Sequence, residues 1–425
     1  MNRSKSSVSL CFASLGAAAV VLVSPQLQAA TLTDNYADIA QAGFEDSLAT
    51  AEVLGSTIEE LIAKPSAEAL QAARAAWVEA RVPYQQTEAY RFGNAIVDEW
   101  EGKVNAWPLD EGLIDYVDAS YGTDSDSNVL YVANVIANPS VVIGGKSIDA
   151  SVLTPDLLSE QLQEAGGSEA NVATGYHAIE FLLWGQDLNG TEAGAGNRAH
   201  TDFDADNCTN GHCERRAQYL KAASDLLLSD LAFMAEQWQA DGAARQALQE
   251  AGEAEVVSTI LTGMGSLSYG ELAGERMRLG LMLHDPEEEH DCFSDNTHFS
   301  HFYDAKGIQN VYLGSYQRTS GEAIEGASLA EKVASVDKDL DTELRQQLAE
   351  TMTAMQAMVD RAEGGEAYDQ MIAEDNEAGN AIVQAAVDAL VRQTKTIERV
   401  VVALGASSVE IEGSDSLDSP DSVFE

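Results

Sequence analysis

Apolar side chains recur at every third or fourth position along most of this 425-residue chain, and this spacing restricts the fold most strongly. It follows the 3.6-residue turn of an α-helix and places an apolar stripe on one helical face. The first stretch contains Ile39, Phe44, Leu48, Leu54, Ile58 and Leu61. Pro65 ends it, and Ser66 is suited to cap a second helix through Tyr84. The pattern predicts an all-α fold.

The remaining stretches extend this prediction to both halves of the chain. Thr154-Pro155-Asp156 has the form of a helix start, and Gly166-Gly167 that of its end. Further helices are predicted over residues 169–184, 215–240, 253–284, 327–363 and 378–404. Two acidic segments without clean periodicity, 97–118 and 285–316, are predicted to be irregular connections. This parallel suggests two helical-bundle domains that are related by an ancient duplication.

The N-terminus has the features of a secretory signal peptide. Arg3 and Lys5 precede an apolar stretch from about Val8 to Val23, and small residues follow at Ala29 and Ala30. No later segment has about 18 uninterrupted apolar residues, so no transmembrane segment is expected after residues 1–30 are removed. The sequence therefore predicts a periplasmic protein, with association with the outer membrane as a second possibility.

Composition and length divide the exported part of the chain. Removing residues 1–30 leaves 395 residues, which exceeds one ordinary hydrophobic core. The predicted parts are an N-terminal helical domain (31–195), a cysteine-containing loop (196–216), a C-terminal helical bundle (217–405) and a disordered acidic tail (406–425). Within the loop, Cys208 and Cys213 are expected to form a disulfide in an oxidising compartment, which leaves Cys292 unpaired.

The charge of the chain limits its partners. The formal net charge is −46 at pH 7, with 70 acidic residues against 24 basic ones. Such a charge repels nucleic acid and attracts cations. Most of these acids are expected to serve solubility, because so many carboxylates cannot all be ligands. We therefore expect no nucleic-acid partner and consider metal ions instead.

His177 and Glu180 are the first candidate ligands. They are three residues apart in a predicted helix, so both side chains lie on one face and can reach one ion. Neutral imidazole with carboxylate suits zinc, iron or manganese. The alternative is a core histidine that forms a hydrogen bond with its helical neighbour.

The surroundings of this pair carry a resemblance to a known family. Gly-Tyr-His-Ala-Ile-Glu at 175–180 resembles the Gly-x-His-x-x-Glu signature of the imelysin family, also called insulin-cleaving membrane proteases. Residues 91–94, 97–102 and 104–112 resemble its first-half signature, and 270–277 and 292–298 its second-half signature, most similar to iron-regulated members. The resemblance implies a two-domain helical periplasmic protein, often linked to iron acquisition, with the His-x-x-Glu motif in a cleft.

The matching blocks supply further candidate ligands. In the first half these are Glu88, Asp98, Asp110 and Glu111, and in the second half His298. Structural roles remain open for them, since Asp110 can cap a helix and Glu88 can pair with Arg91. Asp202, Asp204 and Asp206 alternate as calcium ligands do, but Asn207 and Cys213 exclude a complete EF-hand, so only a looser calcium loop at 202–207 is possible.

Three functions follow from these observations. The leading hypothesis is a periplasmic metal-binding protein for iron acquisition, which holds an iron or zinc ion or an iron chelate at His177 and Glu180 and works with a periplasmic or outer-membrane iron-uptake partner. The second is a metal-dependent peptidase with Glu180 as ligand or base. That reaction needs three protein ligands and an open position, and the pair supplies two ligands at most. The third is a partner-binding scaffold with a structural His-Glu pair.

Overall fold

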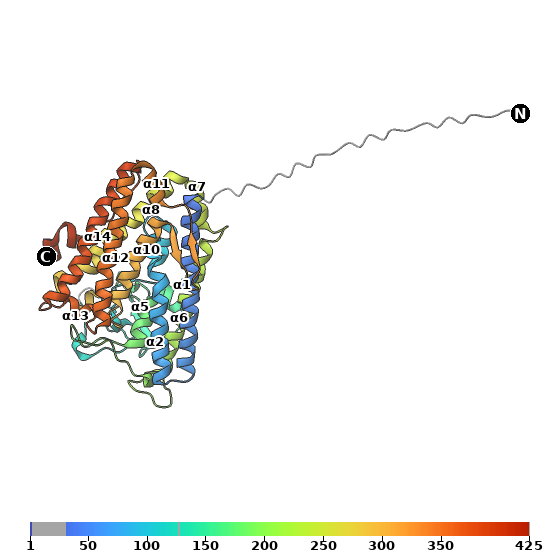
Figure 1. Cartoon of the computed structure of the whole chain (residues 1–425). Coiled ribbons are helices and arrows are strands. Elements are labelled where there is room, and N and C mark those ends of the chain that lie inside the picture. The colour runs from blue at the N-terminus through green and yellow to red at the C-terminus, as the bar shows by residue number, and fades with distance from the viewer. Residues whose placement is uncertain (2–30, 126–127, 425) are drawn as a thin grey trace.

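Long antiparallel helices form the frame of the molecule. The computed structural model describes Met1 and residues 31–125 and 128–424, so the predicted signal peptide lies outside the described residues apart from Met1. Helix α1 (Leu32–Ala63) packs against α2 (Ala67–Gln85) and α6 (Cys213–Gln237), as Figure 1 shows. Thr31 and Ser66 cap α1 and α2 through their hydroxyl groups, as the position of Ser66 predicts.

A second group of helices packs against this frame. The helices of this group are α7 (Ala243–Ala251), α8 (Glu253–Ser266), η7 (Leu267–Arg278), α9 (Leu279–Leu283), α10 (Thr297–Leu313), α11 (Leu329–Val336), α12 (Lys338–Glu363), α13 (Tyr368–Ile372) and α14 (Glu377–Leu404). Helix α10 lies between α2 and α12, and α14 packs on both α12 and the wide π-type helix η7 (Figure 1).

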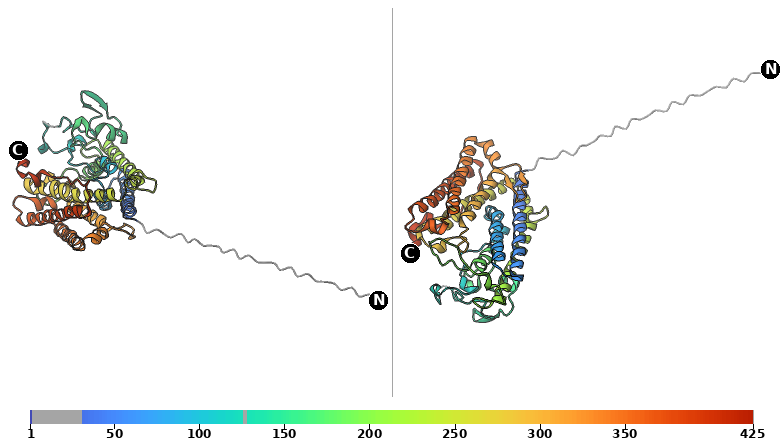
Figure 2. Two further views of the ribbon diagram at one scale, coloured as in Figure 1. Left: turned by 90° about the horizontal axis from the view of Figure 1, so that it is seen from above. Right: turned by 60° about the horizontal axis from the view of Figure 1, so that its bottom comes forward.

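Short elements connect the long helices, and those within residues 128–212 lie at one end of the molecule (Figure 2). The short elements are η1 (Glu88–Tyr90), α3 (Ala95–Glu101), η2 (Glu111–Leu113), η3 (Ala119–Tyr121), α4 (Pro155–Leu157), η4 (Leu158–Leu162), η5 (Ala165–Gly167), α5 (Gly175–Trp184), η6 (His200–Asp202) and η8 (Pro286–Glu288). The strands of the described residues form two antiparallel hairpins, β1 (Ser140–Ile143) with β2 (Lys146–Asp149) and β3 (Ser315–Gln317) with β4 (Ala323–Glu325). The predicted all-α class is confirmed.

The main hydrophobic core draws on both halves of the chain. Phe44 of α1 stacks on Trp238 at the end of α6, with ring centroids 6.1 Å apart, and Tyr90 packs against both rings. A second core joins α13, α14 and η7 through Met371, Leu390 and Met277. The domain boundaries, the duplication and the cleft stay predictions.

Several helix predictions differ from the structure. The helix expected over 327–363 is broken at Asp337 into α11 and α12, and the segment 97–118 begins in α3. The helix expected over 169–184 begins only at Gly175, because residues before it are held by side-chain hydrogen bonds such as that of Asn171 to the Ala165 carbonyl. The segment 285–316, expected to be irregular, contains α10. Its buried face includes His298, His301 and Asp304, so no apolar period reveals the helix.

The C-terminal tail also differs from the expected disorder. It carries α15 (Asp415–Asp418) and η9 (Pro420–Phe424) and packs along η7. Gly270 and Gly274 let the tail approach, since a Cβ at Gly274 would overlap Ser414, and the Ser416 hydroxyl donates to the Gly274 carbonyl at 3.0 Å. Composition predicts disorder here because these contacts use glycine and serine rather than large apolar side chains.

Two further predictions concern covalent and membrane features. Cys208 and Cys213 form a disulfide, as predicted, and Cys292 is a free thiol. Across the residues that the structure describes, no helix has the length and apolar character needed to span a lipid bilayer.

Candidate metal site

Helix α5 is anchored so that His177 and Glu180 face the interior. Its first residue, Gly175, has φ +79°, and a Cβ there would collide with the Val104 carbonyl, so this position needs glycine. The Tyr176 amide donates to the Val104 carbonyl at 2.7 Å, which fixes the start of the helix against the chain at 104. His177 and Glu180 are 1% and 0% exposed.

Glu180 forms hydrogen bonds with groups on both sides. Its Oε2 lies 3.0 Å from His177 Nδ1, and its Oε1 accepts from the Ser294 amide at 3.0 Å and the Ser294 hydroxyl at 2.7 Å. Burial raises the pKa of Glu180, while Ser294 and Arg81 favour its ionised form. When Glu180 is ionised, it can only accept, so His177 Nδ1 carries the proton and His177 Nε2 presents its lone pair.

The facing groups come from the loop between η8 and α10. The rings of His177 and His290 meet edge to face with centroids 4.7 Å apart. Asp291 follows His290 and forms an ion pair with Arg81 of α2 at 3.0 Å, and its other oxygen accepts from Asn296 at 2.8 Å. Burial opposes ionisation of Asp291, but Arg81 and His290 hold its pKa well below the ordinary value.

The three side chains form a donor set that fits a metal ion. One ligand atom each from His177, His290 and Asp291 lies within 4.8 Å of the others. Burial lowers the pKa of His177 to about 3 and also lowers that of His290, so both imidazoles are neutral at pH 7. His177 Nε2 is buried and has no hydrogen-bond partner among the described residues. Two imidazoles with one carboxylate form the donor set typical of non-haem ferrous iron, and zinc uses similar ligands.

Arg81 limits the strength of such a site. It is 1% exposed and already neutralises Asp291, and its second amino group donates to Asn105 at 2.6 Å. A cation near Asp291 would be repelled by the guanidinium unless Arg81 gave up part of this ion pair. The arrangement therefore favours an ion that His177 and His290 bind strongly.

The other predicted ligands lie outside this cluster. Glu88 is buried and pairs with Arg276 at 3.3 Å, not with Arg91. Asp98 is largely exposed and pairs with Arg91 at 3.2 Å. Asp110 is half-buried and accepts a hydrogen bond from Asn128. Glu111 is buried and accepts a hydrogen bond from Gln186 at 3.4 Å. His298 is buried, and its Nδ1 has no hydrogen-bond partner among the described residues.

The sequence-based reasoning missed His290 as a ligand partner of His177, and it missed Asp291, Ser294 and Arg81 altogether. A signal was present, because His290 and Asp291 directly precede the block 292–298 that resembles the family. What sequence could not show is that this loop folds over α5.

The predicted calcium loop is occupied by other interactions. Asp202 is fully buried and accepts from Arg198 at 3.1 Å, Tyr116 at 2.6 Å and Thr209 at 2.7 Å. Asp204 accepts from backbone amides of its own turn. The Asp202 carboxylate is therefore the centre of a buried hydrogen-bond network, and the looser calcium loop stays a prediction.

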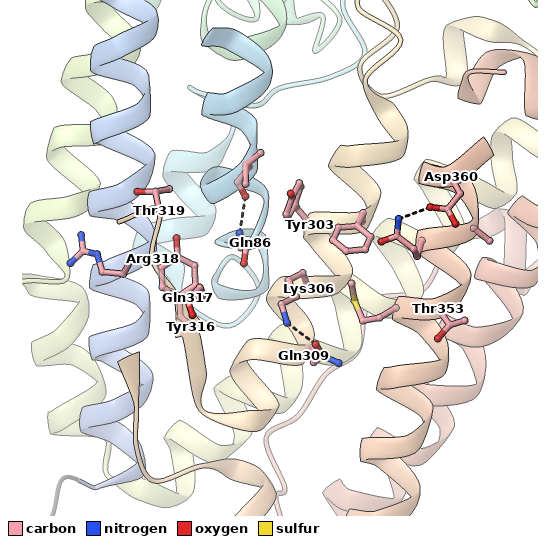
Figure 3. Close-up of a pocket in the computed structure, with 15 residues that line it drawn as sticks. Gln86, Tyr303, Lys306, Gln309, Tyr316, Gln317, Arg318, Thr319, Thr353 and Asp360 are labelled. Carbon is pink, nitrogen blue, oxygen red and sulfur yellow. Dashed lines mark hydrogen bonds between the residues drawn. The ribbon is translucent and has the colours of Figure 1, made fainter. Parts of the chain in front are cut away.

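A large cavity is separate from the metal-ligand cluster. Its volume is about 830 Å³, and it lies between α2, α10, β3 and α12 (Figure 3). Lys306 and Gln309 lie on its wall and form a hydrogen bond of 2.8 Å, while Arg318 is held by Glu45 and Asp46. None of His177, His290 and Asp291 lines this cavity.

Comparisons with known proteins agree with the fold. The family model described as imelysin, whose name places it among peptidases, matches residues 40–397. The chain is also similar to the crystal structure of a protein from Parabacteroides distasonis described as an iron-regulated protein A precursor, with 18% identity and a TM-score of 0.62. That similarity covers 89% of this chain and 97% of the other, and at this identity it establishes a shared fold. No curated protein matches the chain.

Proposed function

The chain belongs to the imelysin family, as its motifs indicate, and from this premise we propose that it is an exported metal-binding protein of iron acquisition. The metal, iron in the first place, is held by His177, His290 and Asp291. Glu180 orients His177 rather than binding the ion directly. The protein acts in the periplasm, where it passes an iron ion or chelate to an uptake partner at the membrane.

One observation carries this proposal. His177 Nε2 is a buried nitrogen without a hydrogen-bond partner among the described residues. The His177 ring meets that of His290 edge to face, and one ligand atom each of His177, His290 and Asp291 lies within 4.8 Å of the others. A buried imidazole nitrogen without a partner costs free energy, and a metal ion would satisfy it. Glu180 would then accept a hydrogen bond from His177, and His177 would bind the metal. Proteins usually orient a histidine ligand with a carboxylate in this way.

The name of the structurally similar protein supports iron as the ion. That protein is described as iron-regulated, and the strongly negative charge of this chain favours cations. The donor set itself suits ferrous iron and zinc alike, so binding measurements must decide between them.

The family name keeps a peptidase as a second candidate. With His290 and Asp291 added to His177, the chain has the three ligands that a zinc peptidase needs. The burial of all three opposes this function, because none is more than 1% exposed and a peptide bond would have to reach the ion. A scaffold with a purely structural His-Glu pair leaves His177 Nε2 unexplained.

Metal content tests the proposal. We would expose the wild-type protein and the variants His177→Ala and His290→Ala to ferrous iron, without oxygen, and to zinc, and measure bound metal by elemental mass spectrometry. His200→Ala is the matched control, because His200 lies outside the cluster. We expect one ion per chain in the wild type and the control and little in the other two. Equal, substoichiometric metal in all four proteins would show that the pair is structural.

Cleavage of casein, with and without chelator, separates transport from catalysis. A transport protein should leave casein intact under both conditions, even when loaded with zinc. Cleavage that the chelator stops and that His177→Ala lacks would establish the peptidase instead.

A further inference from the structure

Three carboxylates meet where the loop that carries His290 and Asp291 approaches α13. Glu289 and Asp295 lie at the two ends of this loop, and Asp369 comes from α13. One oxygen of each lies within 4.8 Å of the others. Glu289 and Asp369 are each 1% exposed. Acidic groups so close together in the interior repel one another and lose hydration, so their arrangement needs a physical cause.

The oxygens of this carboxylate cluster have few partners of their own. Glu289 Oε1, Asp295 Oδ1 and both oxygens of Asp369 are buried and accept no hydrogen bond from the residues that the structure describes. The backbone amides of Gln370 and Asp369 favour the ionised form of Asp369, and the Thr297 side chain favours that of Glu289, but burial outweighs these contacts and raises the pKa of both acids. Buried carboxylate oxygens without donors are rare in folded proteins.

Several other buried acids of this chain form an ion pair with an arginine, and these three do not. Asp291 pairs with Arg81, Asp304 with Arg276 and Asp115 with both Arg198 and Arg216. Within the described parts of the chain, no lysine or arginine forms an ion pair with Glu289, Asp295 or Asp369. Burial raises the pKa of Asp369 to about 7, and burial together with Asp369 does the same for Asp295. The missing partner is a positive charge.

We propose that Glu289, Asp295 and Asp369 bind a hard divalent cation, with Ca²⁺ as the reference ion. Oxygen atoms alone are the ligands that calcium, magnesium and manganese prefer, whereas iron(II) and zinc favour sites with imidazole. Three carboxylates also supply more than the charge that a divalent ion needs. This site differs from the His177 cluster in both residues and donor type, and it does not rest on the proposed function.

The cation connects two parts of the fold. It ties α13 to the loop that begins at Glu289 and ends at Asp295. The same loop carries His290, Asp291 and Ser294, which contact His177 and Glu180. Binding at the carboxylate cluster therefore holds the loop in the position in which the first site is complete.

Calcium binding tests this inference on the full exported chain. Protein treated with chelator and transferred to metal-free buffer at pH 7.5 is titrated with Ca²⁺ alone, by calorimetry and by thermal unfolding. We expect one bound ion and a higher melting temperature. Asp369→Asn should weaken binding at least about tenfold, because it removes a full charge from the ligand set.

Two variants keep the test decisive if Asp369→Asn folds poorly. Asp295→Asn is the second test, because Asp295 has φ +57° and asparagine tolerates this conformation. Asp375→Asn, an exposed neighbour in the same region as α13, is the control and should bind calcium as the wild type does.

Two outcomes would overturn the inference. Unchanged calcium binding in both Asp369→Asn and Asp295→Asn would place the ion elsewhere, and absence of binding to the wild type at millimolar Ca²⁺ and Mn²⁺ would remove the site. The variant His177→Ala separates this inference from the proposed function, because it should lose iron or zinc and keep calcium. Loss of calcium in that variant, with calcium retained in Asp369→Asn, would assign the ion to the first site.

Discussion

Replacement of Glu180 by glutamine should damage metal binding more than its replacement by alanine. In the wild type, Ser294 donates twice to Oε1, while Oε2 faces His177 Nδ1. Because the Ser294 amide can only donate, the glutamine must place its carbonyl at the Oε1 position and its amide group toward His177. The amide then donates to Nδ1, and the proton of the imidazole moves to Nε2, where the metal should bind.

The magnitude follows from the contacts that metal binding would break. To bind a metal, His177 in the glutamine variant must return its proton to Nδ1, so that two buried donors face each other. Unsatisfied buried donors cost about 1–3 kcal/mol each, and a loss of about 3 kcal/mol corresponds to an affinity about 100-fold lower. In the alanine variant no donor opposes the Nδ1 proton, and His177 loses only the group that orients its ring. Loss of such an orienting group lowers metal affinity by about 10-fold at the lower end of the usual range.

Competition with a chromophoric chelator measures both affinities for zinc, after circular dichroism has confirmed that each variant is folded. Our reasoning requires the order wild type, Glu180→Ala, Glu180→Gln from tightest to weakest. An alanine variant weaker than the glutamine variant would refute it, because that order is expected if Glu180 is a direct ligand whose amide analogue still binds weakly.

Three further predictions concern stability. Burial raises the pKa of Glu101 from 4.5 to about 7, with Glu88 contributing, so the folded state binds the extra proton and the wild type loses stability as pH rises between these values. We would measure the free energy of unfolding by urea at pH 5 and pH 8. The difference between Glu101→Gln and the wild type should change by up to about 3 kcal/mol in favour of the variant from pH 5 to pH 8, and the same difference at both pH values would contradict the raised pKa of Glu101. Gly175→Ala should lower the free energy of unfolding by about 2–4 kcal/mol, since it strains a positive φ and collides with Val104. Gly274→Ala should cost about 1–3 kcal/mol and make the C-terminal tail sensitive to limited proteolysis, whereas a tail as resistant as that of the wild type would show that it does not pack there.

The sequence predicted the helices whose apolar period is strong and whose ends carry clear signals. Helix α2, with Ser66 at its start, is found where the pattern places it. Helix α10 was missed, because its buried face carries His298, His301 and Asp304, the last of which pairs with Arg276 of η7. A period of apolar residues cannot reveal a helix whose interior contacts are polar.

The candidate site could be predicted only in part for the same reason. His177 and Glu180 are close in sequence, so helical geometry alone brings them together. His290 and Asp291 lie more than a hundred positions away, and only the packing of a loop on α5 places them beside His177. Spacing rules describe neighbours on one element, whereas a site between elements depends on tertiary contacts.

The packing of the C-terminal tail on η7 has a consequence for how the protein matures. The residues that cover Gly270 and Gly274 are synthesised long after η7 itself. Arg276 lies on the same helix and pairs with Glu88, which is made before η7. This helix therefore acquires its final surroundings only after Ser414 has emerged from the ribosome. A fusion partner placed directly after Phe424 would lie next to this packed tail, so an affinity tag on the N-terminal side of α1 is the safer choice.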